Sequence, residues 1–297
     1  MSSTTSAVRP ARAGAPPGAL ERVPPHVYFV GSAIFHYLGP AFAVLLFARV
    51  DALGVAWLRI ASAAVVFAAW RRPWRTVARL DGAGRRLLLA WGAVLAVMNC
   101  CFYLAIDRLP LGTAVAIEFC GPTVVAALGS RGRRDAVALA LAALGVVALA
   151  DVHLAGSPGG VAFAAGAGLL WSGYIVLGHR VAADDSIRPQ DGLAAGMAVG
   201  ALGLAPALAP VAGPAFVDPA VLAACIAVGL ASSVVPYALE QIAMRRLPRA
   251  RFALLLALLP ATAAIVGAVV LGQVPGIVEA VGILLVVSAA GLRTHEA

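Results

Sequence analysis

The sequence predicts an all-α integral membrane protein with ten transmembrane helices. Hydrophobic residues make up 62% of the 297 residues and charged residues only 12%, whereas soluble domains devote about a quarter of their residues to charge. Apolar runs of about 20 residues, the length that crosses a hydrocarbon core, recur along the whole chain. These runs are continuous, which excludes an outer-membrane barrel built of short alternating strands.

Ten apolar runs are the expected helices, and their order sets the layout of the chain. They cover residues 27–47, 52–70, 87–106, 110–129, 135–152, 160–179, 192–210, 219–243, 250–271 and 276–293. Arg59 interrupts the second run, and only the connections 71–86 and 180–191 are longer than a turn. Residues 1–26, rich in Pro, Ala and Ser, are expected to be a disordered cytoplasmic tail rather than a cleavable signal, and 294–297 a second tail.

The positive charges indicate membrane orientation and not a nucleic-acid partner. All 22 basic residues are Arg, which gives a net charge of +8, and they lie in the gaps between apolar runs. Counting from a cytoplasmic N-terminus, 19 fall in inside segments, and only Arg49 and Arg108 fall outside. This split predicts that both termini are cytoplasmic in a multi-pass protein of the plasma (inner) membrane.

An internal repeat relates the two halves of the chain. "LAIDRLPLGTAVAIEFCGP" aligns with "EQIAMRRLPRARFALLLALLP", so that the interval from Pro110 to Pro122 matches that from Pro248 to Pro260. The copies lie five helices apart, and therefore face the membrane in opposite directions. Inverted repeats of this kind are typical of secondary transporters, which handle substrate near the membrane midplane between the halves.

Glu118 is the foremost candidate for a substrate- or ion-binding residue. It lies about 12 Å along its helix, where a charge costs at least about 2.5 kcal/mol unless it faces the protein interior or a wet cavity. Pro122 lacks the N–H that would bond the carbonyl of Glu118. An ammonium group or a proton would suit this position, and a protonated glutamate that bonds a neighbouring helix is the structural alternative.

Other polar and aromatic residues within the runs are weaker candidates. Those expected to bind substrate or ion, besides Glu118, are His36, Asn99, Tyr103, Trp171, Tyr174 and Tyr237, with interhelical bonding or ordinary packing as the alternative. Glu240 and Arg59 are expected to form a gate or ion pairs, Glu240 with a terminal arginine such as Arg245. Helix breaks are expected at Pro40, Pro122, Pro236 and Pro260.

No cofactor or metal site is expected. The cysteines, Cys100, Cys101, Cys120 and Cys225, all lie inside apolar runs without metal-ligand spacing. The sequence has no nucleophile–base set and no phosphate-binding loop. The sequence leaves the substrate, the direction of flux, the coupling ion and the oligomeric state open.

Three stretches resemble the EamA-type branch of the drug/metabolite transporter superfamily, closest to its threonine/homoserine exporter group. They are "NCCFYLAIDRLPLGTAVAIEFCGP", "GVAFAAGAGLLWSGYIVLGHR" and "VVPYALEQIAMRRLP". The resemblance implies two inverted five-helix repeats, at 27–152 and 153–293, around a central cavity. The chain departs from the family pattern at Leu259 and Gln273, where glutamate is frequent.

The sequence and the resemblance together predict a secondary transporter, not an enzyme. It would export a small amino-acid-like metabolite by alternating access, with one five-helix half rocking against the other, and protons are the candidate coupling ion. An intramembrane enzyme acting on a lipid or isoprenoid is one alternative, but the carboxylates and histidines are sparse. A membrane assembly or sensor protein is another, although a scaffold needs no opposed halves.

Overall fold

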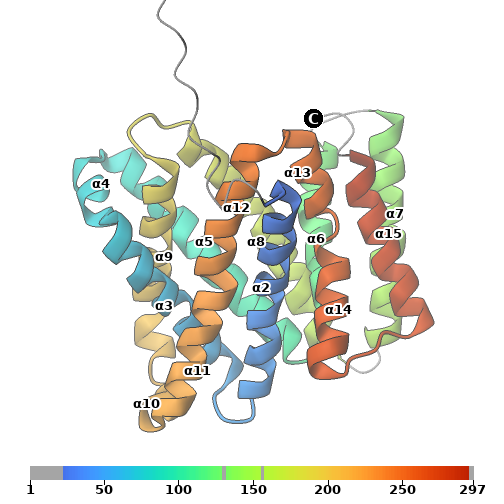
Figure 1. Ribbon diagram of the computed structural model, residues 1–297, viewed down its shortest axis with the longest axis horizontal. Coiled ribbons are helices and arrows are strands. Elements are labelled where there is room, and N and C mark those ends of the chain that lie inside the picture. Colours follow the sequence, from blue (N-terminus) through green and yellow to red (C-terminus); the bar gives the residue numbers. More distant parts are fainter. Residues whose placement is uncertain (1–22, 129–131, 155–156, 294–297) are drawn as a thin grey trace, which may run out of the picture.

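The computed structural model describes residues 23–128, 132–154 and 157–293, which form only helices and connections (Figure 1). The first 22 residues of the expected N-terminal tail and the expected tail at 294–297 lie outside these ranges. The long helices are α2 (Pro25–Leu46), α3 (Ala52–Arg71), α5 (Gly82–Ile106), α6 (Leu111–Leu128), α7 (Arg133–Leu154), α8 (Pro158–Ala182), α9 (Pro189–Leu208) and α15 (Ile277–Arg293). The shorter ones are α4 (Pro73–Arg79), α10 (Gly213–Val217), α11 (Pro219–Gly229), the π-helix η1 (Leu230–Val234), α12 (Val235–Arg246), α13 (Arg249–Leu256) and α14 (Leu259–Leu271).

Helices occupy each of the ten ranges expected from the sequence. Within the described residues, six helical segments are long and apolar enough to cross a membrane. They are Pro25–Leu46, Ala52–Arg71, Gly82–Ile106, Pro158–Ala182, Gln190–Leu208 and Pro219–Met244. Leu111–Val124, Leu259–Leu271 and Ile277–Leu292 are shorter apolar helices. The protein is therefore an all-helical membrane protein that crosses the bilayer several times.

Aspartates cap the first turns of several helices. The Asp51 carboxylate accepts a hydrogen bond from the Leu53 N–H at 2.8 Å, and Asp81 accepts one from the Gly84 N–H at 2.7 Å. Each bond satisfies an N–H that has no partner inside its helix, which fixes where α3 and α5 begin.

The four prolines expected to break helices differ in their effect. Pro40 and Pro122 do not end their helices, because α2 and α6 continue through them and lose only the hydrogen bond that a proline cannot donate. Pro236 lies in the first turn of α12, directly after the π-helix, and Pro260 in the first turn of α14. Residues 257–258 separate α13 from α14, so the ninth expected run is two helices.

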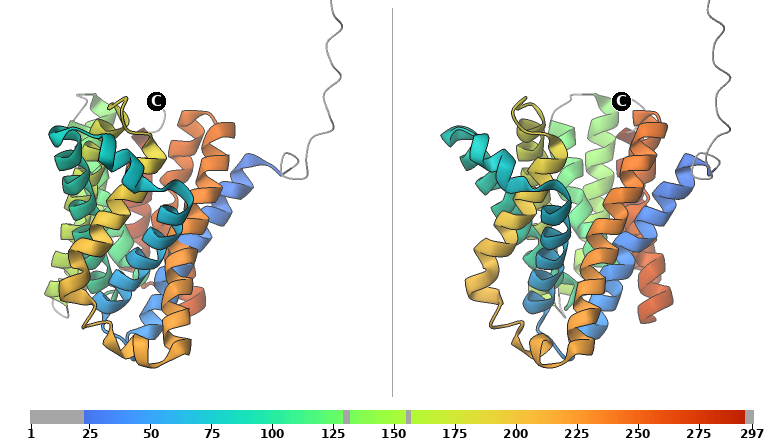
Figure 2. Two further views of the ribbon diagram at one scale, coloured as in Figure 1. Left: turned by 90° about the vertical axis from the view of Figure 1, so that its left-hand side faces the viewer. Right: turned by 60° about the vertical axis from the view of Figure 1, so that its left-hand side comes forward.

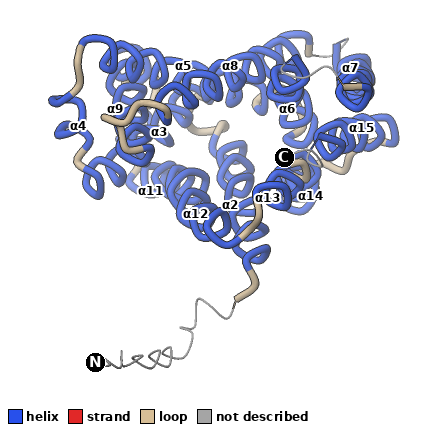
Figure 3. Tube along the Cα trace, turned by 90° about the horizontal axis from the view of Figure 1, so that it is seen from above, coloured by secondary structure: helices blue, strands red, loops and turns tan. Residues whose placement is uncertain are grey.

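Each long helix before α8 packs on a helix from the second part of the chain. The pairs are α2 with α12, α3 with α9, α5 with α8, α6 with α14 and α7 with α15. Seen from above, α5, α8 and α6 lie on one side of the molecule and α11 to α14 on the other (Figure 3). The views in Figure 2 show the same helices standing roughly parallel, with α4 inclined at one end.

Glycines allow neighbouring helices to approach closely. A Cβ atom on Gly92 of α5 would lie 2.6 Å from the carbonyl oxygen of Gly196 in α9, and one on Gly145 of α7 would lie 2.9 Å from that of Gly282 in α15. Contact between backbones is the usual role of small residues in membrane helices.

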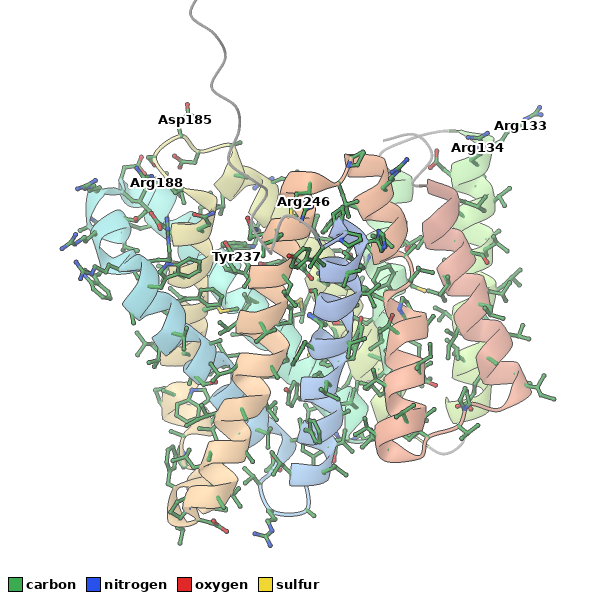
Figure 4. The ribbon with its side chains drawn as sticks, in the orientation of Figure 1. Arg133, Arg134, Asp185, Arg188, Tyr237 and Arg246 are labelled. Carbon is green, nitrogen blue, oxygen red and sulfur yellow. The ribbon has the colours of Figure 1, made fainter. Side chains whose placement is uncertain are left out.

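One end of the molecule carries many of the arginines. Figure 4 shows Arg133, Arg134, Arg188 and Arg246 toward the end where α2 begins and α15 finishes. We call this the arginine-rich end. At this end Arg71 forms an ion pair of 2.8 Å with Asp191, which joins α3 to α9. At the opposite end Arg49 pairs with Asp218 at 3.2 Å.

Candidate functional site

A cavity of about 320 Å³ lies among the helices, within the size range of small-molecule sites. Its lining comes from α2, α3, α5, α6, α8, α9, η1, α12, α13 and α14, so both parts of the chain contribute. The polar and aromatic residues that line it are His36, Tyr37, Arg59, Asn99, Phe102, Glu118, Trp171, Tyr174, Ser232, Ser233, Tyr237 and Glu240.

The structure brings most of the predicted residues to this cavity. Of the candidates named from the sequence, Glu118, His36, Asn99, Trp171, Tyr174, Tyr237, Glu240, Arg59 and Pro236 line it. Tyr103 is not in the lining. It is fully buried beneath Arg59, whose guanidinium carbon lies 5.6 Å from the centre of the tyrosine ring. Within the described residues its hydroxyl has no hydrogen-bond partner.

Glu118 is held in place by the crossing of α6 and α8. A Cβ atom on Gly168 of α8 would lie 2.5 Å from the carbonyl oxygen of Glu118, so the two backbones touch. The carbonyl that Pro122 leaves without its helical donor therefore packs against α8, and the carboxylate borders the cavity. Among the described residues this carboxylate has no hydrogen bond and no ion pair. Arg59 is near enough to interact with it electrostatically.

Arg59 carries a buried positive charge, and the oxygen atoms that accept its hydrogen bonds are all neutral. Its Nε donates to Ser232 Oγ at 2.8 Å and its Nη2 to the Ser232 carbonyl at 3.4 Å, while Nη1 donates to Asn99 Oδ1. Asn99 is oriented in turn, because its Nδ2 donates to the Leu95 carbonyl at 2.8 Å. Arg59 is 8% exposed and forms no ion pair with any described carboxylate.

The π-helix places Ser232 against Arg59. A Cβ on Gly229 would lie 2.8 Å from the Arg59 carbonyl, which shows how closely α11 approaches α3 at this level. In a regular α-helix the Ser232 carbonyl would accept from residue 236, but Pro236 has no N–H, and Arg59 donates to that oxygen instead. Ser232 was not predicted from the sequence. A proline leaves the carbonyl four residues before it without a donor, so Pro236 frees the carbonyl of Ser232 just as Pro122 frees that of Glu118.

Glu240 is tied to α2. Its carboxylate accepts a hydrogen bond from Ser32 Oγ at 2.9 Å, and the same hydroxyl lies 3.3 Å from the Pro236 carbonyl. The pairing of Glu240 with Arg245 stays a prediction, because the Arg245 side chain is not described. Ser32 was not predicted, since a lone serine in an apolar run gives little indication of its partner.

Aromatic rings form rigid walls around the polar groups. The Trp171 ring meets Phe119 edge-on with centroids 5.1 Å apart, and Tyr174 stacks on Trp91 at 5.0 Å. Tyr237, toward the arginine-rich end in Figure 4, contacts Phe67 at 5.2 Å. Rings fixed in this way hold the shape of the cavity.

The two departures from the family pattern lie apart from each other. Leu259 lines the main cavity, so an apolar side chain stands there in place of a carboxylate. Gln273 lies beside a second cavity of about 110 Å³, where its Oε1 accepts from the Leu111 N–H at 2.9 Å. In the described part of the chain no three His, Cys, Asp or Glu residues cluster as metal ligands would, and the four cysteines are free thiols.

Comparison with known proteins matches the chain to one family, to curated relatives and to solved structures. Residues 158–293 match the EamA-like transporter family. The chain is 37% identical over 267 residues to the threonine/homoserine exporter RhtA of Escherichia coli K12, covering 86% of this chain and 88% of that protein. It is 38% identical over 242 residues to the exporter of the same name from Salmonella typhimurium LT2, covering 79% of each. A crystal structure with 20% sequence identity shares the fold at a TM-score of 0.53, over 90% of this chain and 95% of that one.

Proposed function

Because the chain belongs to the EamA-like transporter family, and its relatives are membrane exporters, we propose that it exports a small amino-acid-like metabolite by alternating access. Threonine and homoserine, which the relatives' names give as their substrates, are the first candidates. Neither an intramembrane enzyme nor an assembly or sensor protein is favoured by these relatives.

The Glu118 carboxylate is the single observation that carries this proposal. It borders a cavity of metabolite size and, among the described residues, forms no hydrogen bond and no ion pair. A charge at such depth is costly and is typically found at a substrate or ion pathway. We assign to Glu118 the binding of the substrate's amino group or of a coupling proton.

Helix pairing supports two inverted five-helix repeats, at 27–152 and 153–293, which give ten transmembrane helices. Counted among the ten expected transmembrane helices, α2 is the first, α5 the third, α8 the sixth and α12 the eighth. A two-fold relation that exchanges each helix with the one five places along turns the pair α2–α12 into α8–α5, and both pairs pack closely. The same operation turns α6–α8 into α14–α2, which also pack together. In keeping with an inverted relation, α2 and α8 run in opposite directions in Figure 1.

The distribution of arginine supports a cytoplasmic location for the arginine-rich end. Arg133, Arg134, Arg188 and Arg246 lie toward the end where α2 begins and α15 finishes (Figure 4). Under the positive-inside rule this end faces the cytoplasm, and with it both termini.

Replacing Glu118 by glutamine tests the proposal in proteoliposomes loaded with labelled L-threonine. We expect Glu118→Gln to lower the transport rate at least about tenfold, since a neutral amide loses the charge-assisted bond to an ammonium group. The pH dependence of the remaining transport should also change if Glu118 carries a proton.

Glu279→Gln is the matched control, because this carboxylate lies beside the smaller cavity and outside the main one. Its transport rate should stay near that of the unmodified protein. Unchanged rate and pH dependence in Glu118→Gln would contradict the role given to Glu118.

A further inference from the structure

We propose that Arg59 binds the carboxylate of the substrate, so that the cavity selects molecules with both an amino and a carboxyl group. This inference rests on the proposed function and deepens it by assigning the second end of the substrate. Arg59 and Glu118 both line the main cavity, on α3 and α6.

The first argument is that Arg59 forms no ion pair with any carboxylate of the described residues. Its three acceptors, Asn99 Oδ1, Ser232 Oγ and the Ser232 carbonyl, are all neutral. Buried charges in membrane proteins are costly and are usually paired. A substrate carboxylate would supply an ion-pair partner for Arg59 each time the site fills.

The second argument is the number of donors. A guanidinium group carries five N–H bonds in a fixed plane. The hydrogen bonds to Asn99 and Ser232 use three of them. Two remain on a side chain that borders the cavity, and two is the number that a carboxylate accepts in a bidentate contact.

The third argument is that residues of α5 and η1 hold Arg59 in position. Ser232 is fixed by donating to the Val228 carbonyl at 2.6 Å, and Asn99 by donating to Leu95 at 2.8 Å. The guanidinium group also lies over the Tyr103 ring. A planar group held in this way is prepared for one ligand orientation, which lowers the entropy lost on binding.

Two oppositely charged side chains that line one cavity without forming an ion pair fit the same substrate. The two groups interact electrostatically, yet no ion pair joins them. A zwitterion whose ammonium and carboxylate are carried on one carbon places opposite charges close together, and it can satisfy both side chains at once. Glu240 is less suited to receive the ammonium, because Ser32 already donates to its carboxylate.

Competition against labelled L-threonine in exchange across proteoliposomes tests the inference. L-Threonine amide keeps the ammonium group but lacks the carboxylate, so we expect it to compete at least about tenfold more weakly than unlabelled L-threonine. Equal competition by the amide and by L-threonine would overturn the inference.

Variants then assign the effect to Arg59. In Arg59→Gln the ratio between the amide and L-threonine should fall to about one, while Arg59→Lys, which keeps the charge but loses the planar fork, should give an intermediate ratio. Arg49→Gln, a change at an exposed ion pair on the opposite end, is the control and should keep the original ratio. A folded Arg59→Gln or Arg59→Lys variant with the original ratio would assign the carboxylate to another group.

The outcomes separate the inference from the function on which it rests. If neither L-threonine nor L-homoserine exchanges, the proposed function and the inference both fail. If they exchange and the amide competes equally, only the inference fails. Should Arg59→Gln not fold, Arg59→Lys and the competition in the unmodified protein still decide.

Discussion

Replacing Gly168 by alanine should destabilise the protein and displace the Glu118 backbone. The new Cβ would lie 2.5 Å from the Glu118 carbonyl oxygen, about 0.9 Å short of the 3.4 Å at which ordinary contact begins. The atom that it meets is backbone and not the end of a flexible side chain, so α6 and α8 must separate. Overpacking of this kind costs about 1–3 kcal/mol, more than the gain of up to about 1 kcal/mol from alanine's helix propensity.

The free energy of unfolding in mixed micelles, followed by circular dichroism, measures this cost. Gly203→Ala in α9 is the matched control, because its Cβ would have nothing within 4 Å, and it should be neutral or slightly stabilising. Transport should fall in Gly168→Ala and not in Gly203→Ala, since only the former moves Glu118. Equal stability and equal transport in the two variants would refute the reasoning about the crossing.

Two further predictions concern charged groups outside the cavity. Arg71→Ala should cost about 2 kcal/mol, between the values for exposed and buried pairs, because it leaves the buried Asp191 without its ion-pair partner. Arg49→Ala, at an exposed ion pair, should cost less than about 1 kcal/mol. Denaturant titration measures the free energy of unfolding of both variants, and an equal loss in the two would refute the comparison. The Ser186 hydroxyl and N–H donate hydrogen bonds to the Asp184 carboxylate and lower its pKa. These bonds therefore stabilise the folded protein at pH values above the ordinary pKa of aspartate, and the stabilisation is lost as the pH falls through the lowered pKa. Ser186→Ala should return the Asp184 pKa toward its ordinary value, and a carboxyl NMR titration without such a rise would exclude the contact.

Local chemistry in the sequence predicted the helical ranges and much of the cavity lining. Apolar run length predicted where the helices lie, and the cost of a charge in hydrocarbon pointed to Glu118 and Arg59. Both line the cavity, because only an interior surface can accommodate such groups.

The sequence could not show which helices meet. Arg59 donates hydrogen bonds to Asn99 on α5 and Ser232 in η1, and these acceptors are 40 and 173 residues away along the chain. The π-helix was also not predicted; it lies between Gly229, which closely approaches α3, and Pro236. Short α4 begins at Pro73 within the connection 71–86, where no helix was expected.

The pairing of helices across the chain limits which helices can move together as one rigid group. Because α2, α3, α5, α6 and α7 each rest on a helix from the second part of the chain, sliding the first five helices as a block would break every one of these interfaces. A division that follows the interfaces keeps α3, α5, α8 and α9 in one bundle, and α7 with α15 in another. Each bundle combines helices from the first and the second part of the chain, so a movement that keeps these interfaces intact carries helices of both parts together.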